Sequence, residues 1–253
     1  MKVLFWIACV AILIPSRLFA QAGPPYQTDD PDPVEYRHWE FYLATQHAAA
    51  ADVATGTAPH VEVNYGAVPN LQLHVLVPLA YAHPAGGRTA FGAGEVELGA
   101  KFRFIQEGTR RPMVGTFVQT EWPTGNEAEG LGTGHLHVLL PLWVQKSFGA
   151  WSTDVGGGLW INPGAGNRNY WAAGWQVQRH LSTRATIGGE AYGTTADEVG
   201  GSSSVRVNIG VVVNMTDQHH LLASVGRSTI GERVVQGYFA YQFTIGPNDP
   251  LAR

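Results

Sequence analysis

The sequence predicts an all-β chain that crosses a membrane as a closed, antiparallel, up-and-down β-barrel of about 12 strands. The first observation is composition: only 14% of the 253 residues are charged, 11% are aromatic and 31 are glycine. The second is an alternation of apolar and polar residues through stretches of about ten residues, the length that a tilted strand needs to cross a bilayer. The third is that the connections between these stretches are alternately long and short, as in outer-membrane barrels.

Composition also excludes several other classes of protein. Disordered chains are poor in aromatic residues and rich in charge, and helical membrane proteins need apolar runs of about 20 residues. The formal net charge of −4 offers no basic field to attract nucleic acid. We therefore expect no nucleic-acid partner.

Residues 1–22 have the features of a secretory signal peptide. Lys2 precedes an apolar run over residues 3–15, which is too short for a membrane anchor. Small residues allow cleavage after Ala20 or after Ala22, and the sequence leaves both sites open. The only cysteine lies within this segment, so we expect a mature chain with neither disulfide nor thiol.

A segment rich in proline and aspartate, GPPYQTDDPDPVEY, follows at residues 23–36. Its prolines exclude a regular strand or helix. We assign residues 23–37 to an N-terminal segment that lies in the periplasm or plugs the barrel, residues 38–245 to the barrel, and residues 246–253 to a periplasmic tail.

The strands are predicted from the period-two pattern, taken in chain order. Residues 71–82 are the clearest case, because Leu71, Leu73, Val75 and Val77 share one face while Gln72 lies on the other. The predicted strands are 38–47, 59–66, 71–82, 94–105, 112–122, 134–147, 151–161, 170–181, 185–193, 204–215, 219–228 and 234–245.

The connections predict how the barrel sits in the membrane. The first, third and every later odd connection is long, and the even ones are short. Because extracellular loops are long and periplasmic turns short, the first strand should run outward and both termini should be periplasmic.

The apolar face of each strand should meet lipid, because a charge there costs about 2–4 kcal/mol at the bilayer midplane. Aromatic residues near the strand ends fit the interfacial girdles of such barrels. A soluble β-rich core is the alternative, but it explains this placement at the ends less well. The girdle candidates are Trp39, Tyr65, Tyr81, Phe104, Trp122, Trp151, Trp171 and Phe243.

The polar face should line the lumen, and its acids outnumber its bases. Rings of acidic side chains favour cations, so an open lumen would pass cations preferentially. The alternative is an interior closed by ion pairs among Glu97, Lys101 and Arg103. The predicted lumen residues are Glu40, Glu62, His74, Glu95, Glu97, Lys101, Arg103, Glu121, His137, Asp154, Glu190 and Arg206.

No catalytic, metal or cofactor site is predicted. Ser202 lies near Asp197 in sequence, yet no serine–histidine–acid spacing of a triad is present. His135 and His137 fall on one face of a strand, which we interpret as polar lining rather than as metal ligation. The chain is therefore not expected to be an enzyme.

Several stretches carry a resemblance to a known family: GPPYQTDDPDPVEYRHWEFY (23–42), WPTGN (122–126), GLGTGHLHVLLPLWVQKSFG (130–149) and WINPGAGNRNYWAAGWQVQR (160–179). They resemble a family of outer-membrane β-barrels named after the MetA pathway of phenol degradation. The resemblance implies a porin-like or transporter-like barrel and no catalytic residues. The chain departs from a common barrel ending, since residues 244–253 follow the last aromatic residue, Phe243. Two later stretches continue the resemblance: TADEVGG (195–201) and NMTDQHHLLASVGRS (214–228).

We therefore expect an outer-membrane channel or transporter for small solutes with a mild cation preference. One alternative is a barrel for hydrophobic or aromatic compounds, with the N-terminal segment as a plug and with Trp143 and Trp160 pointing inward. Another is a structural or adhesive barrel. The expected partners are outer-membrane lipids and lipopolysaccharide, the barrel-assembly machinery and a small-molecule solute.

Overall fold

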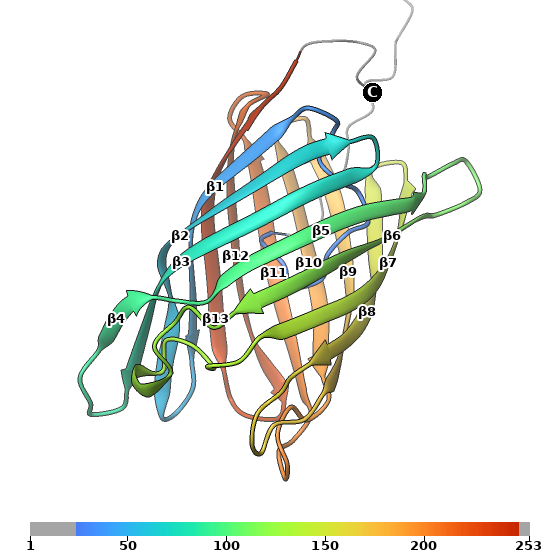
Figure 1. The fold of residues 1–253 in the computed structure, drawn as a ribbon. Coiled ribbons are helices and arrows are strands. Elements are labelled where there is room, and N and C mark those ends of the chain that lie inside the picture. The colour runs from blue at the N-terminus through green and yellow to red at the C-terminus, as the bar shows by residue number, and fades with distance from the viewer. Residues whose placement is uncertain (1–23, 248–253) are drawn as a thin grey trace, which may run out of the picture.

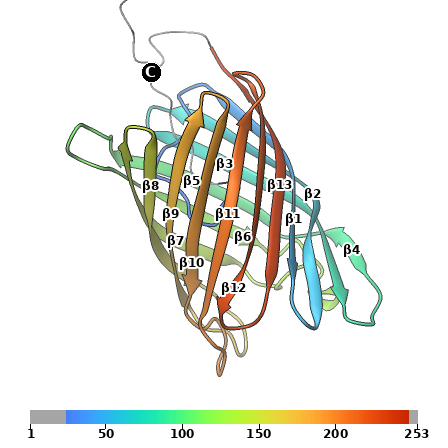
Figure 2. The ribbon, with the colours of Figure 1, turned by 180° about the vertical axis from the view of Figure 1, so that it is seen from behind.

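The computed structural model describes residues 24–247, which form one closed antiparallel barrel (Figures 1 and 2). The predicted signal peptide and most of the predicted tail lie outside the described residues. The strands are β1 Trp39–Ala49, β2 Val53–Val68, β3 Leu71–Pro84, β4 Ala90–Ala93, β5 Val96–Ile105, β6 Met113–Trp122, β7 His137–Phe148, β8 Trp151–Ile161, β9 Tyr170–Ser182, β10 Ala185–Thr194, β11 Ser204–Asn214, β12 His219–Ile230 and β13 Val235–Ile245.

The barrel closes where its first and last strands meet. β1 pairs with β13 from Trp39↔Ile245 to Ala49↔Val235, and with β2 on its other side. Closure leaves no open sheet edge, which is what a backbone surrounded by hydrocarbon requires. No helix in the described range is long and apolar enough to span a bilayer. The predicted fold class is confirmed.

The barrel is a 12-stranded one although 13 strands are named, because β4 and β5 follow each other along β3 and together count as one barrel strand. β4 pairs with the second half of β3 and β5 with the first half. The sequence predicted one strand over 94–105. The interruption falls at Gly94, whose N–H donates to Pro78 O at 3.0 Å, so the chain continues along β3 without a regular ladder.

Side chains alternate between the two faces as period two requires. On β3, Leu73, Val77 and Leu79 point outward and are 48%, 52% and 44% exposed, whereas Gln72 and His74 are buried inside. Five of the predicted girdle residues are exposed on the outer face at or near strand ends: Trp39, Phe104, Trp122, Trp151 and Trp171.

The two ends of the barrel differ in the length of their connections. Short turns 69–70, 149–150 and 183–184 lie at the end where β13 finishes, and connections 123–136 and 195–203 lie at the opposite end (Figure 1). A 3-10 helix, Glu127–Glu129, occupies part of connection 123–136.

The first connection is much shorter than the sequence predicted. β2 begins at Val53 rather than at residue 59, so only residues 50–52 link it to β1. The sequence prediction began this strand at Pro59 and left residues 48–58 as the connection. In the structure, the pairing register with both neighbouring strands shifts between Thr57 and His60. A proline is tolerated there because a bulge needs no ladder hydrogen bond at that position.

Residues 24–37 run inside the ring of strands (the dark blue segment in Figures 1 and 2). Pro25, Tyr26, Thr28, Asp30 and Pro31 are buried against the inner wall. The segment forms no strand of the barrel apart from an isolated bridge between Tyr36 and Gly66.

Candidate functional site

The N-terminal segment is fixed to the wall by its backbone. Glu190 on β10 accepts hydrogen bonds from the N–H groups of Gln27 at 2.9 Å and Thr28 at 2.7 Å. Ser224 on β12 donates to Pro25 O at 2.6 Å. These wall side chains supply partners to backbone groups that have none in a sheet, as buried backbone groups require.

Three aspartates of the segment pair with the two inward-facing bases on β5. Lys101 Nζ lies 2.9 Å from Asp29 Oδ1 and 3.2 Å from Asp30 Oδ1. Arg103 pairs with Asp32 through Nη1. Burial raises the pKa of both Asp30 and Asp32 above the usual aspartate value, although the cations of β5 oppose that shift.

These pairings correct one alternative from the sequence. Glu97 was considered as the ion-pair partner of Lys101 and Arg103 across the lumen. Instead, Glu97 accepts from Gln119 Nε2 at 2.6 Å and lies 3.0 Å from His74 Nε2. The acids that pair with the two bases therefore come from the N-terminal segment and not from the barrel wall.

Glycines on the inner wall make room for the segment. A Cβ atom at Gly210 would lie 2.9 Å from three atoms of Tyr26, and one at Gly174 would lie 2.2 Å from Thr28 Oγ1. Real Cβ contacts are not that short, so these glycines permit the close approach.

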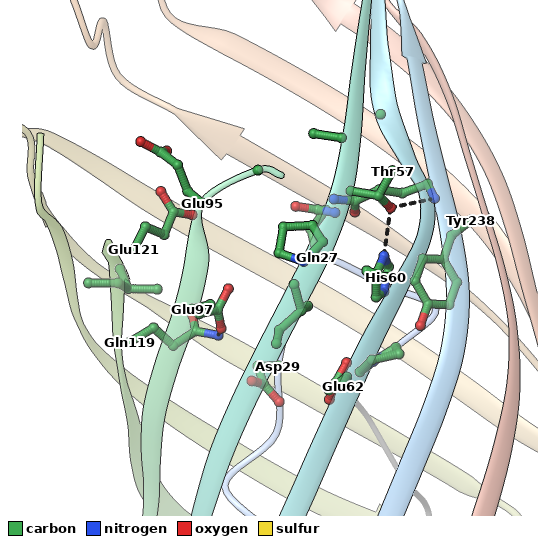
Figure 3. A pocket seen from close by; sticks show the side chains of 18 of the residues that line it. Gln27, Asp29, Thr57, His60, Glu62, Glu95, Glu97, Gln119, Glu121 and Tyr238 are labelled. Carbon is green, nitrogen blue, oxygen red and sulfur yellow. Dashed lines mark hydrogen bonds between the residues drawn. The ribbon is translucent and has the colours of Figure 1, made fainter. Parts of the chain in front are cut away.

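Beyond the segment, toward the end with the long connections, the barrel encloses a cavity of 620 Å³. Its lining contains wall carboxylates from neighbouring strands and Asp29 from the segment (Figure 3). No lysine or arginine is among the described residues that line it. We call this cavity the acidic chamber; its wall carboxylates are Glu62, Glu95, Glu97 and Glu121.

A hydrogen-bond network positions two of these carboxylates. His74 Nδ1 lies 2.7 Å from Asn64 Oδ1, and Asn64 Nδ2 donates to Glu62 Oε1 at 2.8 Å. The His74 ring lies between Glu62 and Glu97 and meets Phe117 edge-on, with ring centroids 5.2 Å apart. The chamber wall is therefore a fixed polar surface rather than a set of free side chains.

At the mouth of the chamber, Glu95, Glu121 and His137 come together. Their ligand-type atoms all lie within 4.8 Å of one another. Thr133 in connection 123–136 holds Glu95 Oε1, with the backbone N–H at 2.7 Å and Oγ1 at 2.8 Å. The sequence placed His137 and both glutamates in the lumen but did not bring them together.

Aromatic side chains form the remainder of the chamber wall. Trp143 is 3% exposed, and both Trp143 and Trp160 line the chamber. Phe117, Tyr192 and Tyr238 line it as well. The chamber thus offers carboxylates and apolar ring faces side by side.

The other predicted lumen residues lie outside the chamber lining. Asp154 is fully buried on β8, Glu40 accepts from Tyr42 Oη at 3.0 Å, and Arg206 Nη1 donates to Gln236 at 3.3 Å. Sequence reasoning assigned no role to Asp29, Asp30 and Asp32. The clustering of these aspartates between prolines marks the segment as unusual, but it does not indicate which basic residues of the wall they would pair with.

Comparison with known proteins bears on the fold. No protein-family model matches the sequence, and no curated protein does. The solved structures include the COG4313 outer membrane channel from Pseudomonas putida F1, with a TM-score of 0.71, 14% identity and coverage of 85% of this chain and 98% of that one. The architecture is that of an outer-membrane barrel.

Other similar structures differ in what they do. The NanC porin has a TM-score of 0.57 at 5% identity, covering 82% of this chain and 99% of that one. The translocator domain of autotransporter NalP from Neisseria meningitidis has a TM-score of 0.54 at 11% identity, covering 84% and 89%. Porins and a translocator domain share the architecture, so function has to be argued from the lumen.

Proposed function

We propose that the protein is a porin-like channel of the outer membrane that passes small solutes and prefers cations. The observation that carries this proposal is the acidic chamber, whose described lining has four wall carboxylates and no lysine or arginine. An acidic lining with low-dielectric walls concentrates cations and repels anions. The aspartates of the N-terminal segment pair with Lys101 and Arg103. The channel's preference for cations should therefore be stronger than a count of the acidic and basic side chains on the wall alone would predict.

The orientation and partners are part of the same proposal. The end carrying the long connections would face outward, so that solutes enter the acidic chamber first. Outer-membrane lipids and lipopolysaccharide would surround the apolar belt, and the barrel-assembly machinery would insert it. The relation to the MetA-pathway barrels stays a prediction of the sequence.

Reversal potentials in planar bilayers under a KCl gradient test the preference, with EDTA present to remove trace metal. The wild-type channel should favour K⁺, and Glu95→Gln with Glu121→Gln should shift the reversal potential toward Cl⁻. Glu127→Gln with Glu129→Gln removes the same charge from the exposed 3-10 helix and should shift it less, because salt screens exposed charges. An anion-preferring wild type, or equal shifts, would contradict the proposal.

A second candidate is a barrel for apolar or aromatic compounds. It is favoured by the N-terminal segment inside the lumen and by Trp143 and Trp160 on the chamber wall. Saturable binding of the apolar dye N-phenyl-1-naphthylamine, lost in Trp143→Ala with Trp160→Ala, would support this candidate. Swelling of protein-containing liposomes in small sugars, without saturable dye binding, would support the channel.

A further inference from the structure

The cluster of Glu95, Glu121 and His137 is placed by the strand register. Glu121 lies directly opposite His137 in the ladder between β6 and β7, and Glu97 lies opposite Glu121 in the ladder between β5 and β6. Glu95 precedes Glu97 by two residues, so its side chain falls on the same inner face. Three neighbouring segments of the wall therefore contribute one ligand-type side chain each: Glu121 and His137 face each other in the ladder, and Glu95 lies two residues beyond their position.

The spacing within the cluster suits ligands of one metal ion. His137 Nδ1 and Glu121 Oε2 form a long hydrogen bond of 3.3 Å, since an N–H···O hydrogen bond usually spans about 2.7–3.2 Å. Two ligands of a tetrahedral ion with bonds of about 2.0–2.1 Å are roughly 3.3–3.4 Å apart. Glu95 completes the group within 4.8 Å, and small side-chain rotations would bring it to bonding distance.

The state of the His137 ring is a separate observation. The residue is 8% exposed, and its Nε2 is buried with no hydrogen-bond partner among the described residues. A neutral imidazole has one protonated nitrogen and one lone pair. A doubly protonated ring pairs with Glu121 through Nδ1 but leaves Nε2–H without an acceptor. If only Nδ1 carries a proton, the Nε2 lone pair lacks a donor; if only Nε2 carries it, the Nδ1 lone pair faces the Glu121 carboxylate. A cation bound by Nδ1 and Glu121 removes the repulsion between that lone pair and the carboxylate.

The surrounding charge favours a cation as well. Glu95, Glu97 and Glu121 are close together, and within the described part of the chain no lysine or arginine forms an ion pair with any of them. One imidazole and two carboxylates form a ligand set suited to zinc and similar transition metals. Calcium prefers six to eight oxygen ligands.

We propose that Glu95, Glu121 and His137 bind one divalent transition-metal ion at the mouth of the acidic chamber. The ion would link β5, β6 and β7 and, through the Thr133 hydrogen bonds to Glu95, connection 123–136. It would also offset negative charge at the mouth. Binding itself does not depend on whether the barrel conducts.

Isothermal titration of the folded, detergent-solubilised barrel with Zn²⁺ tests the site. We expect one Zn²⁺ per barrel in the wild type and affinity at least about tenfold lower in Glu121→Gln and in His137→Gln. His83→Gln removes an exposed imidazole from the same end of the barrel and should leave affinity unchanged. Ca²⁺ should bind more weakly than Zn²⁺.

Two results would overturn the proposal. One is wild-type Zn²⁺ binding no tighter than that of His137→Gln, and the other is an equal loss in His83→Gln. Heat-modifiable mobility on gels shows whether each variant is folded, and Glu95→Gln, which lies between strands, provides a variant that changes no ladder position. Since the titration measures no conductance, failure of the channel proposal would leave its result interpretable.

Discussion

Lys101 Nζ lies 2.9 Å from Asp29 Oδ1, so a buried ammonium on β5 joins the barrel wall to the N-terminal segment. Lys101 is 5% exposed, and Asp30 gives it a second carboxylate at 3.2 Å. Removing one partner of a buried ion pair typically costs about 3–5 kcal/mol, because the other charge stays buried without compensation. Lys101 should therefore be one of the main side chains that hold the segment in the lumen.

Lys101→Met should release the N-terminal segment and raise the single-channel conductance. The substitution keeps the length of the side chain but leaves Asp29 and Asp30 with no cation, so water becomes the better environment for them. Conductance in planar bilayers, together with protease cleavage within residues 24–37, measures the release. Lys146→Met is the matched control, because Lys146 pairs with Glu107 outside the lumen. An unchanged conductance in a folded Lys101→Met barrel would contradict the prediction.

Gly210→Ala should loosen the segment without changing any charge. The added methyl group would lie 2.9 Å from the ring and hydroxyl of Tyr26, and such overpacking typically costs about 1–3 kcal/mol. We expect a conductance between those of the wild type and Lys101→Met. Gly237→Ala is the control, since the nearest atom to its added methyl group would be Ser224 O at 3.7 Å. Equal conductance in the two glycine variants would count against a packed interface at Tyr26.

The inward or outward direction of the wall side chains could be predicted from the sequence, because side chains alternate between the two faces of a strand with a period of two. Leu73 and Val77 point outward while Gln72 and His74 point inward, and no tertiary information is needed to separate them. The alternation also limits how neighbouring strands can pair, because a shift of one residue would move the apolar side chains to the inner face. The fold class and the sorting of side chains onto two faces were therefore predictable.

The contacts of the N-terminal segment inside the lumen could not be predicted in the same way. Asp29 and Lys101 are far apart in the sequence, and no local pattern specifies which wall residue an irregular segment meets. The early start of β2 was missed for a different reason: Pro59 is a strand breaker in a regular ladder, but it is tolerated where the register shifts. Grouping Glu95, Glu121 and His137 required the relative register of three strands, which single-strand patterns do not give.

Val77→Arg should destabilise the barrel far more than an arginine on the inner face. Val77 lies midway along β3 on the outer face and is 52% exposed, so arginine there should cost about 2–4 kcal/mol in a bilayer. Gln119→Arg places the same charge inside, beside Glu97, and should cost less than about 1 kcal/mol. Urea unfolding in lipid vesicles measures both. Similar costs would mean that the outer face does not contact lipid.

Cysteine labelling on intact cells should show which end of the barrel faces outward. The only cysteine of the chain is Cys9, in the predicted signal peptide, so an introduced cysteine would be the only thiol of the mature protein. Arg88→Cys and Ser202→Cys lie in exposed connections at the end opposite the last residue of β13, and a membrane-impermeant maleimide should label both. Arg110→Cys and Thr183→Cys lie in exposed connections at the end where β13 finishes and should be labelled only after the cells are opened. The reverse pattern would place the acidic chamber on the periplasmic side, so that solutes entering from outside would meet the N-terminal segment first.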